Sequence, residues 1–271
     1  MTSVNAYRDW TPQARERALR LLQETEQSNW RPFYCPYRDC NGRPHEAGDG
    51  WDFPHGRTSQ RPPLGDDWLT WAFLGGRGSG KTRGGAEWSH RLAKKFPGCR
   101  LALISPTGPE VRDTLIEGES GILNTAAPGE LPEWEPSKKK LTWPNGSTGW
   151  GYSGEEPDRL RGKQHHFGWL DEPAHMPLIE DVWSNFLFGL RLGINPHVLL
   201  TTSPLPIKWL KDIIDDQHTV VTHSTTYDNL DNLPPHFRKI ILERYEGTRL
   251  GKQEIEGLLL DELEGALWNT L

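Results

Sequence analysis

The stretch that determines the fold lies between residues 68 and 88 and reads WLTWAFLGGRGSGKTRGGAEW. Within it, residues 75–82 match the pattern G-x-x-x-x-G-K-[ST], with an apolar run before the glycines and a helical pattern after them. Glycines in such a loop let consecutive backbone N–H groups approach phosphate oxygens, and the positive end of the following helix adds to the attraction. A chance glycine-rich turn is the alternative, but the order of strand, loop and helix favours a nucleotide-binding loop.

The residues of this loop have expected roles. The nucleotide-binding residues are Gly75, Gly76, Arg77, Gly78, Ser79, Gly80, Lys81 and Thr82. We expect Lys81 to reach the β- and γ-phosphates and the Thr82 hydroxyl to bind Mg²⁺. Arg77 is a catalytic candidate because charge on the γ-phosphate must be neutralised during hydrolysis, although a plain surface arginine is the alternative.

A second motif indicates the class of nucleotide-binding protein. Residues 167–172 read FGWLDE, an apolar run that ends in two adjacent acids. Asp171 would hold Mg²⁺ directly or through water, and Glu172 would be the general base that polarises the attacking water. The alternative is an ordinary strand end with an acidic turn, which the loop upstream makes less favourable. The pair therefore predicts an ATPase that uses Mg²⁺.

Short apolar runs and helical patterns alternate along the chain. The apolar runs cover residues 71–74, 101–104, 167–170, 198–200 and 220–221, and the helical patterns cover about 81–95, 177–191, 206–215, 234–245 and 245–263. Repetition of strand and helix predicts a mainly parallel sheet flanked by helices. Asn145 and Gly146, between alternating apolar positions, predict a local hairpin within residues 139–152.

A candidate strand at 100–104 lies between the loop strand and the strand that ends at Asp171. We interpret it as the inserted strand of an additional-strand ATPase, a class that is mostly mechanical or strand-handling motors. The predicted fold class is therefore α/β, a P-loop NTPase of the additional-strand catalytic-glutamate type. A third polar strand end carries hydroxyls where a sensor of hydrolysis belongs, beside the γ-phosphate, although such triplets are usually solvated strand ends. Its residues are Thr201, Thr202 and Ser203.

The first 66 residues differ from the rest. Residues 11–27 have a helical pattern, and residues 30–66 are rich in proline, glycine and aromatic side chains. Disordered linkers are poor in aromatics, so we predict an ordered but irregular N-terminal arm at 1–66 and an ATPase domain at 67–271.

The arm also contains a possible metal site. Cys35, Cys40, His45 and His55 could complete a tetrahedral structural Zn²⁺ site. Only the first half of their spacing fits the usual zinc pattern. Free thiols packed among aromatics and solvated imidazoles are the alternative.

Composition limits the other possibilities. The 271 residues carry 31 Lys and Arg against 37 Asp and Glu, a formal net charge of -6. No window approaches the roughly 18 consecutive apolar residues that a membrane-spanning helix needs, and the N-terminus has no signal-peptide pattern. Three cysteines fit a reducing compartment. The acidic balance provides no general electrostatic attraction for nucleic acid, so any DNA contact would be a local patch.

Five ordered blocks resemble the large terminase subunit of tailed bacteriophages and related gene-transfer particles, the ATP-driven motor that packages DNA into a preformed capsid. The blocks are WLTWAFLGGRGSGKTRGGAEW (68–88), EEPDRLRG (155–162), GWLDEPAHM (168–176), LLTTSPLP (199–206) and YEGTRLGKQEIEGLLLDELEGALW (245–268). They extend from about Gln60 to Trp268. The arginine inside the loop and the GAEW after it are much narrower signals than a general phosphate-binding loop.

The resemblance implies residue roles. Residues 75–82 would bind ATP, with Asp171 and Glu172 as Mg²⁺ ligand and catalytic glutamate, and residues 201–203 would couple hydrolysis to DNA movement. Gln60 lies at the place of the family's adenine-contacting glutamine. The block at 155–162 is similar to one that supplies a trans-acting arginine finger in some relatives. Its candidates are Arg159 and Arg161, and the sequence leaves open which of them acts.

The resemblance also implies partners and a location. We expect the chain to move double-stranded DNA together with a portal protein and a small terminase subunit, docked on the procapsid portal in the host cytoplasm. The family assembles as a ring, commonly described as pentameric, whereas we expect a monomer in isolation. The chain ends where a ribonuclease-H-like nuclease domain would begin, so we expect no DNA cleavage by it.

Three other functions use a similar loop. Helicases normally add a second motor domain, for which 271 residues leave little room, and phosphate-loop kinases usually lack the Asp-Glu pair. A structural ring protein could bind ATP without hydrolysing it. Intact Lys81, Thr82, Asp171 and Glu172 argue against that last possibility.

Overall fold

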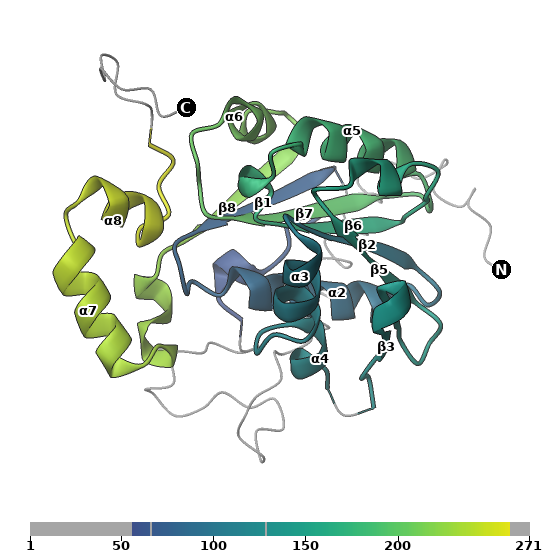
Figure 1. Ribbon diagram of the computed structural model, residues 1–271, viewed down its shortest axis with the longest axis horizontal. Helices are drawn as coiled ribbons and strands as arrows, with labels where there is room; N and C mark the ends of the chain where they lie inside the picture. The colour runs from purple at the N-terminus through teal and green to yellow at the C-terminus, as the bar shows by residue number, and fades with distance from the viewer. Residues whose placement is uncertain (1–55, 66, 128, 261–271) are drawn as a thin grey trace, which may run out of the picture.

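The structure, a computed structural model, describes residues 56–65, 67–127 and 129–260 (Figure 1). The helix expected at 11–27 and the candidate zinc ligands Cys35, Cys40, His45 and His55 lie outside the described residues. The division between arm and ATPase domain at residue 66 stays a prediction. No helix in the described part of the chain combines the length and apolar character that crossing a bilayer requires.

A mainly parallel eight-stranded sheet forms the centre of the molecule, with strand order β3-β4-β5-β2-β6-β7-β1-β8. Its parallel part consists of β1 (Thr70–Gly75), β2 (Arg100–Ser105), β5 (Thr148–Ser153), β6 (Phe167–Asp171), β7 (His197–Thr202) and β8 (Thr219–Ser224). The antiparallel edge consists of β3 (Glu133–Glu135) and β4 (Lys140–Thr142). All five predicted apolar runs lie in parallel strands, and the predicted hairpin at Asn145 and Gly146 joins β4 to β5.

The strand inserted between the loop strand and the Asp171 strand is β7. It pairs with both neighbours, placing Thr201 opposite Asp171 on β6 and Thr202 opposite Leu74 on β1. Strand β2, which the sequence suggested for this position, lies on the other side of β6. That assignment was wrong because crossover connections let a parallel strand skip its neighbour in the chain. The additional-strand fold class itself is confirmed.

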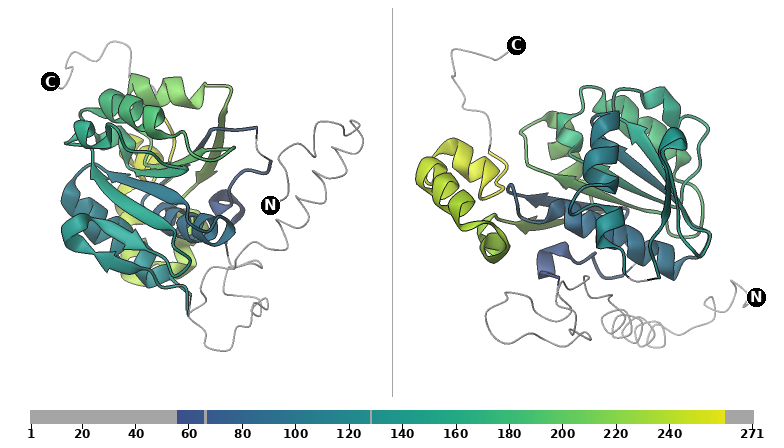
Figure 2. Two further views of the ribbon diagram at one scale, coloured as in Figure 1. Left: turned by 90° about the vertical axis from the view of Figure 1, so that its right-hand side faces the viewer. Right: turned by 60° about the horizontal axis from the view of Figure 1, so that its bottom comes forward.

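Helices cover both faces of the sheet (Figure 1). One face is covered by α2 (Lys81–Lys95), α3 (Gly108–Glu110) and α4 (Ile122–Thr125), and the other by α5 (Ile179–Gly189) and α6 (Lys208–Ile214). Beside the sheet, and apart from both layers, lie α7 (Pro235–Tyr245) and α8 (Arg249–Glu254), which are yellow in Figure 2. The helix predicted at 245–263 is only partly present. Tyr245 ends α7, Arg249–Glu254 form α8, and the described chain is irregular from there through residue 260.

The core is rich in tryptophan. Trp71, Trp88 and Trp169 are among the largest fully buried side chains. Gly85 allows α2 to lie directly on Trp169, since a Cβ at position 85 would be only 2.1 Å from Cε2 of that ring. This close approach fixes the helix that follows the phosphate-binding loop against β6.

We therefore expect Gly85→Ala to destabilise the protein. The Trp169 ring cannot retreat easily because it is buried and its Nε1 donates a 2.7 Å hydrogen bond to Thr201. Overpacking of this kind costs roughly 1–3 kcal/mol of the free energy of unfolding, measurable by urea denaturation. Adding Trp169→Phe should recover part of the loss. An unchanged free energy of unfolding for Gly85→Ala would show that the helix does not pack here as described.

His165, two residues before β6, is a buried titratable group without a counter-charge. It is 2% exposed, and neither ring nitrogen has a hydrogen-bond partner within the described residues. Burial, followed by the positive charges of Arg100, His166 and Lys163, lowers the pKa of His165 from 6.5 to about 4. Below pH 6.5 the unfolded chain binds a proton that the folded chain accepts only near pH 4, so the folded state loses stability over that interval.

The predicted size of this loss is roughly 3 kcal/mol. His165→Leu removes the titrating group, so between pH 7 and pH 4 the wild-type protein should lose about 3 kcal/mol more of its free energy of unfolding than this variant does. Urea denaturation of both proteins across this pH range measures the difference. Parallel pH profiles would contradict the prediction.

Candidate active site

The loop of residues 75–82 joins β1 to α2 and lines a pocket of about 1080 Å³. Gly78 and Gly80 have φ angles of 72° and 88°, which glycine adopts without strain. The 15-residue helix α2 begins at Lys81, so its positive end is at the loop. A Cβ on Gly76 would lie 2.2 Å from the carbonyl oxygen of Ile255, which shows how closely the C-terminal segment covers the loop.

Side chains from distant parts of the chain hold the carbonyl groups of the loop. Arg57 Nη2 donates to Ser79 O at 2.5 Å, and Gln60 Nε2 donates to Gly80 O at 2.9 Å. From the other side, Asn229 Nδ2 donates to Gly78 O at 2.6 Å and Thr226 Oγ1 donates to Arg77 O at 2.7 Å. A loop whose carbonyls are bound in this way can present its N–H groups to an anion.

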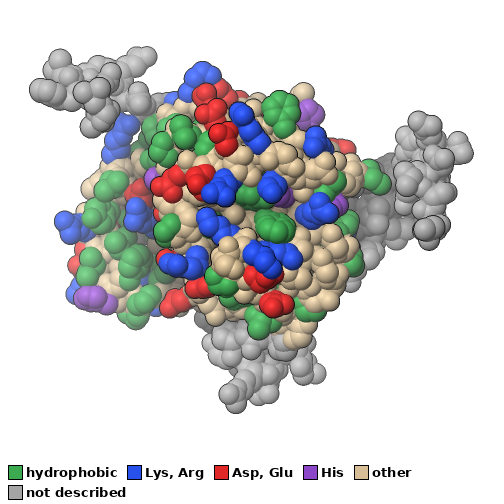
Figure 3. Space-filling view, turned by 45° about the vertical axis from the view of Figure 1, so that its right-hand side comes forward, with side chains coloured by type: hydrophobic (Ala, Val, Ile, Leu, Met, Phe, Trp, Pro, Cys, Tyr) green, Lys and Arg blue, Asp and Glu red, His purple; other side chains and the backbone are tan. Residues whose placement is uncertain are grey.

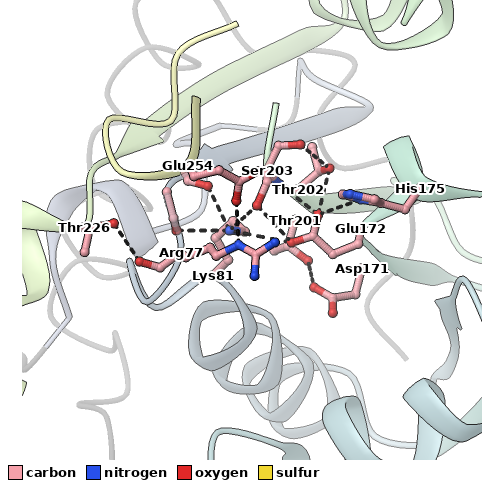
Figure 4. Close-up of polar contacts among 12 residues, drawn as sticks. Arg77, Lys81, Asp171, Glu172, His175, Thr201, Thr202, Ser203, Thr226 and Glu254 are labelled. Carbon is pink, nitrogen blue, oxygen red and sulfur yellow. Dashed lines mark hydrogen bonds and ion pairs between the residues drawn. The ribbon is translucent and has the colours of Figure 1, made fainter. Parts of the chain in front are cut away.

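Lys81 lies at the centre of the site, buried to 8% exposure (Figure 4). Its Nζ donates to the carbonyls of Gly75 at 2.8 Å and Gly76 at 3.2 Å, and to Ser203 Oγ at 3.2 Å. The same Nζ is 3.6 Å from Glu172 Oε1. One ammonium group therefore connects the loop to the ends of β6 and β7.

Asp171 is held by the neighbouring strand. Thr201 Oγ1 donates to Asp171 Oδ1 at 2.6 Å and accepts from Trp169 Nε1 at 2.7 Å. The carboxyl is buried at 4% exposure. Burial, and then the negative charge of Glu172, raise the pKa of Asp171 to about 7.

Glu172 has a backbone conformation that few side chains adopt. Its φ of 47° makes it, with Lys139, one of two non-glycine residues with positive φ among the described residues. Oε2 accepts from the Ser203 backbone N–H at 2.9 Å and from Thr202 Oγ1 at 3.2 Å, and His175 Nδ1 is 3.4 Å away. Such outliers persist only where the surrounding structure determines them, and they cluster at functional sites.

Opposing effects act on the pKa of this carboxyl. Burial acts to raise the pKa of Glu172, but the His175 hydrogen bond, the Lys81 charge and the Ser203 N–H together outweigh it and lower that pKa to about 2. The same hydrogen bond raises the pKa of His175. Glu172 is therefore an ionised acceptor at neutral pH.

The pocket contains suitable groups for a nucleotide and a hard cation. Ser79 Oγ is buried in the loop without a hydrogen-bond partner among the described residues, which leaves a polar atom available to a ligand. Thr82 lines the pocket from the first turn of α2. Asp171 ends β6 beside the pocket residue Glu172 but is buried and is not itself among the residues that line the pocket. Hydroxyl and carboxylate oxygens are ligands that Mg²⁺ prefers. The described residues contain no group of three or more His, Cys, Asp and Glu side chains of the kind that forms an all-protein metal cage.

The remaining predicted residues divide into two groups. Arg77 lines the pocket, but its Nε is 2.5 Å from Glu254 Oε2 in α8. Arg159 and Arg161 lie away from the pocket on the short helix η4 (Pro157–Leu160) and directly after it, each 72% exposed. Their guanidinium groups lie 3.4 Å from Glu156 and 3.1 Å from Asp158, respectively.

Several pocket residues were not identified from the sequence. Arg57 was assigned to the irregular arm, and His175 was read only as part of a family-like block. Asn229 and Glu254 reach the loop from the C-terminal part of the chain. Residues 110–120 add an acidic wall through Glu110, Asp113 and Glu119 and include the π-helical turn η2 (Val111–Ile116), whose helix type is often found at functional sites. No local motif indicates these contacts, because they depend on how the chain folds back.

Comparison of the fold with solved structures gives a consistent result. A large terminase from a thermophilic bacteriophage is 19% identical, with a TM-score of 0.60 over 72% of this chain and 49% of that one. The Thermus phage P74-26 large terminase ATPase domain is 17% identical, with a TM-score of 0.55 over 76% of this chain and 91% of that domain. The HK97 bacteriophage large terminase is 16% identical, with a TM-score of 0.51 over 73% of this chain and 47% of that one.

The chain spans about half the length of the first and the last of these three terminases. At these identities the similarity establishes the fold, that of terminase ATPase domains.

No curated protein matches the sequence significantly. A family model described as "Terminase large subunit, T4likevirus-type, N-terminal" matches residues 72–271, from inside β1 to the last residue. This match covers most of the chain and confirms the resemblance found in the sequence, and the protein therefore belongs to the large terminase family, in its N-terminal part.

Proposed function

We propose that this chain is the ATP-hydrolysing motor domain of a viral DNA-packaging terminase. It couples hydrolysis of Mg-ATP to the translocation of double-stranded DNA into a capsid through the portal. The observation that carries the proposal is the convergence of Glu172 and Ser203 on the ammonium group of Lys81. Lys81 begins α2 after the loop that follows β1, and Glu172 and Ser203 directly follow the adjacent strands β6 and β7. A phosphate-binding lysine, an ionised carboxylate and a polar strand end are the parts that hydrolysis of a γ-phosphate requires.

Binding of ATP would change the partners of Lys81. Its present acceptors are mainly loop carbonyls, which phosphate oxygens can replace as stronger, charged acceptors. The Lys81 charge is one of the influences that lower the pKa of Glu172. When the ammonium turns to the phosphates, Glu172 becomes more basic and better able to accept a proton from the attacking water. A nucleotide bound here therefore prepares its own general base.

Thr82 and Asp171 would hold Mg²⁺, which neutralises charge on the β- and γ-phosphate oxygens. The Thr201 hydroxyl orients the Asp171 carboxyl for this task, since it donates to Oδ1 from the adjacent strand. The fit rests on the oxygen donors present at the end of β6 and in the first turn of α2.

The coupling role of Thr201, Thr202 and Ser203 has support from their contacts. Thr201 binds Asp171, while Thr202 and Ser203 bind Glu172, and Ser203 also binds Lys81. The chain continues from Ser203 to α6 within a few residues. A change in the partners of Glu172 can thus be transmitted to a helix on the far face of the sheet. Any DNA contact would be a local patch, because Lys and Arg side chains on the face in Figure 3 are interspersed with acidic and apolar ones.

Assembly into a ring, commonly a pentamer, would supply the arginine finger. Arg159 and Arg161 are exposed and do not line the pocket of their own chain, as a residue acting on a neighbouring subunit requires. The other proposed partners are the portal protein and the small terminase subunit, at the procapsid in the host cytoplasm. Two further expectations remain predictions: the isolated chain is a weakly active monomer, and these 271 residues do not cleave DNA.

Glu172→Gln tests the general base. The amide keeps an oxygen that can accept from the Ser203 N–H, so ATP affinity should stay within a few-fold of wild type, while turnover falls by about 10²–10⁴. Phosphate release measures turnover, and equilibrium titration measures binding. Glu180→Gln, at an exposed position in α5, is the matched control and should keep wild-type turnover. Wild-type turnover in Glu172→Gln would show that another group activates water.

Complementation tests the trans finger. An Arg161→Ala subunit keeps an intact ATP site, whereas a Lys81→Ala subunit keeps an intact finger. A ring made only of Arg161→Ala subunits, or only of Lys81→Ala subunits, should lose about 10³-fold in turnover on the portal. A ring made from both variants should regain activity wherever the intact finger of one subunit faces the intact ATP site of its neighbour. Arg159→Ala, mixed with Lys81→Ala in the same way, identifies which arginine acts. If neither arginine variant loses activity in the assembled ring, the finger lies elsewhere.

A further inference from the structure

The two oxygens of the Glu172 carboxylate have different surroundings (Figure 4). Oε2 accepts from the Ser203 backbone N–H at 2.9 Å and from Thr202 Oγ1 at 3.2 Å, and it lies 3.4 Å from His175 Nδ1. The contacts of Oε1 are looser, at 3.4 Å to Ser203 Oγ and 3.6 Å to Lys81 Nζ. Oε2 is therefore the anchored oxygen, and Oε1 faces the ammonium group at which we expect the γ-phosphate.

The backbone after β6 brings His175 to this carboxylate. Glu172 is followed by the 3₁₀ turn η5 (Pro173–His175), and the His175 backbone N–H donates to the Glu172 carbonyl at 3.0 Å. A turn of this kind brings residues three positions apart together, so the same two residues also meet through their side chains. Both neighbours of the histidine, Ala174 and Met176, are buried, whereas His175 is exposed and lines the pocket. The core thus fixes the turn on both sides of one histidine that faces the site.

A hydrogen-bond donor at this place suits a general base. Histidine Nδ1 can donate to a carboxylate from the cationic ring and from the neutral tautomer that carries its proton on that nitrogen. A distance of 3.4 Å is long for such a bond, but catalytic hydrogen bonds often tighten only when the substrate binds. Fixing one carboxylate oxygen orients the other, and a displacement of about 1 Å at a reacting group can cost roughly 10²-fold in rate. The contact of His175 with Oε2 can thus set the direction in which Oε1 points.

The other two anchors of Oε2 come from a different part of the chain. Thr202 ends β7 and Ser203 follows it, in the segment that we propose couples hydrolysis to movement. Their contacts with Glu172 change when that segment moves relative to β6. His175 shares a short turn with Glu172, so its contact moves together with the carboxylate. It is the anchor that can persist while the contacts to β7 are exchanged.

We propose that His175 is a positioning residue for the general base, and that it holds Oε2 of Glu172 so that Oε1 faces the attacking water. The inference rests on the proposed function and adds a residue to the machinery of that same site. The sequence placed this histidine only within the block at 168–176 and gave it no role of its own.

Orientation and basicity have opposite effects on the rate. A donor on Oε2 stabilises the carboxylate, so it contributes to the low pKa of Glu172 and makes the base weaker. Lys81 and the Ser203 N–H act in the same direction, so removal of His175 alone leaves part of this influence in place. Without the histidine, Oε2 is held from the side of β7 alone. We therefore expect the loss of orientation to outweigh the gain in basicity, and turnover to fall.

Three variants of the full chain test the inference by phosphate release and by calorimetric titration with ATP. His175→Ala should lower kcat roughly tenfold and keep ATP affinity within a few-fold of wild type, because the affected group acts in the chemical step. His175→Asn should recover most of the lost kcat, since its side-chain N–H₂ can donate from the place of Nδ1. His236→Ala, at an exposed position in α7 outside the pocket wall, is the matched control and should keep wild-type kcat and ATP affinity.

A double variant distinguishes positioning from a separate role. Adding His175→Ala to Glu172→Gln should reduce turnover no further, because the histidine acts through the carboxylate that is already lost. The urea midpoint of His175→Ala should equal that of wild type, since an exposed ring contributes little to the core.

Four results would overturn the inference while leaving the ATPase proposal intact. They are unchanged or higher kcat in His175→Ala, no recovery in His175→Asn, a further loss in the double variant, and a kcat loss that follows a lower urea midpoint. If wild type bound no ATP, the proposed function itself would fail, and this inference with it.

Discussion

The register between β6 and β7 is the constraint on which the site depends. Pairing of Asp171 with Thr201 brings a hydroxyl to one carboxyl and, one step further, brings the Ser203 N–H to Glu172. A shift by one residue would turn every side chain of the strand to the opposite face of the sheet. The buried apolar residues on both faces of these strands prevent such a shift, so packing of the core also fixes the geometry of the site.

The phosphate-binding loop is stabilised by both ends of the described chain. Arg57 and Gln60 bind its carbonyls from before β1, and Thr226, Asn229 and Glu254 bind it from after β8. Glycines give the loop its curvature but also cost conformational entropy when it is ordered. The surrounding hydrogen bonds offset that cost, and they connect the loop to helices that do not belong to the sheet layers.

The electrostatics of the site depend on one buried cation among several acids. Lys81 is near Glu172 in this state, and its charge also opposes the rise in the pKa of Asp171. Arg77 is occupied in the same way by Glu254. Both positive charges of the loop are thus paired with carboxylates of the protein, and an incoming triphosphate would compete for them. Exchange of these partners is a physical means by which occupancy of the pocket can be communicated to α8 and to β7.

The local pattern of residues 68–88 predicted the strand, the loop and the helix correctly, because glycine spacing and apolar runs act over a few neighbouring residues. The pair Asp171 and Glu172 was likewise visible at the end of an apolar run. The sequence did not show which strand is inserted between β1 and β6, because crossover connections decide which strands are neighbours in a parallel sheet. Local sequence also could not reveal that Arg57 and Asn229, separated by 172 positions, bind one another at the loop, or that Gln60 is already occupied by backbone groups. The sequence alone thus determined which chemical groups the protein has and the elements that carry them, whereas only the tertiary structure decided which of those groups meet, since contacts between distant segments depend on the packing of the whole sheet.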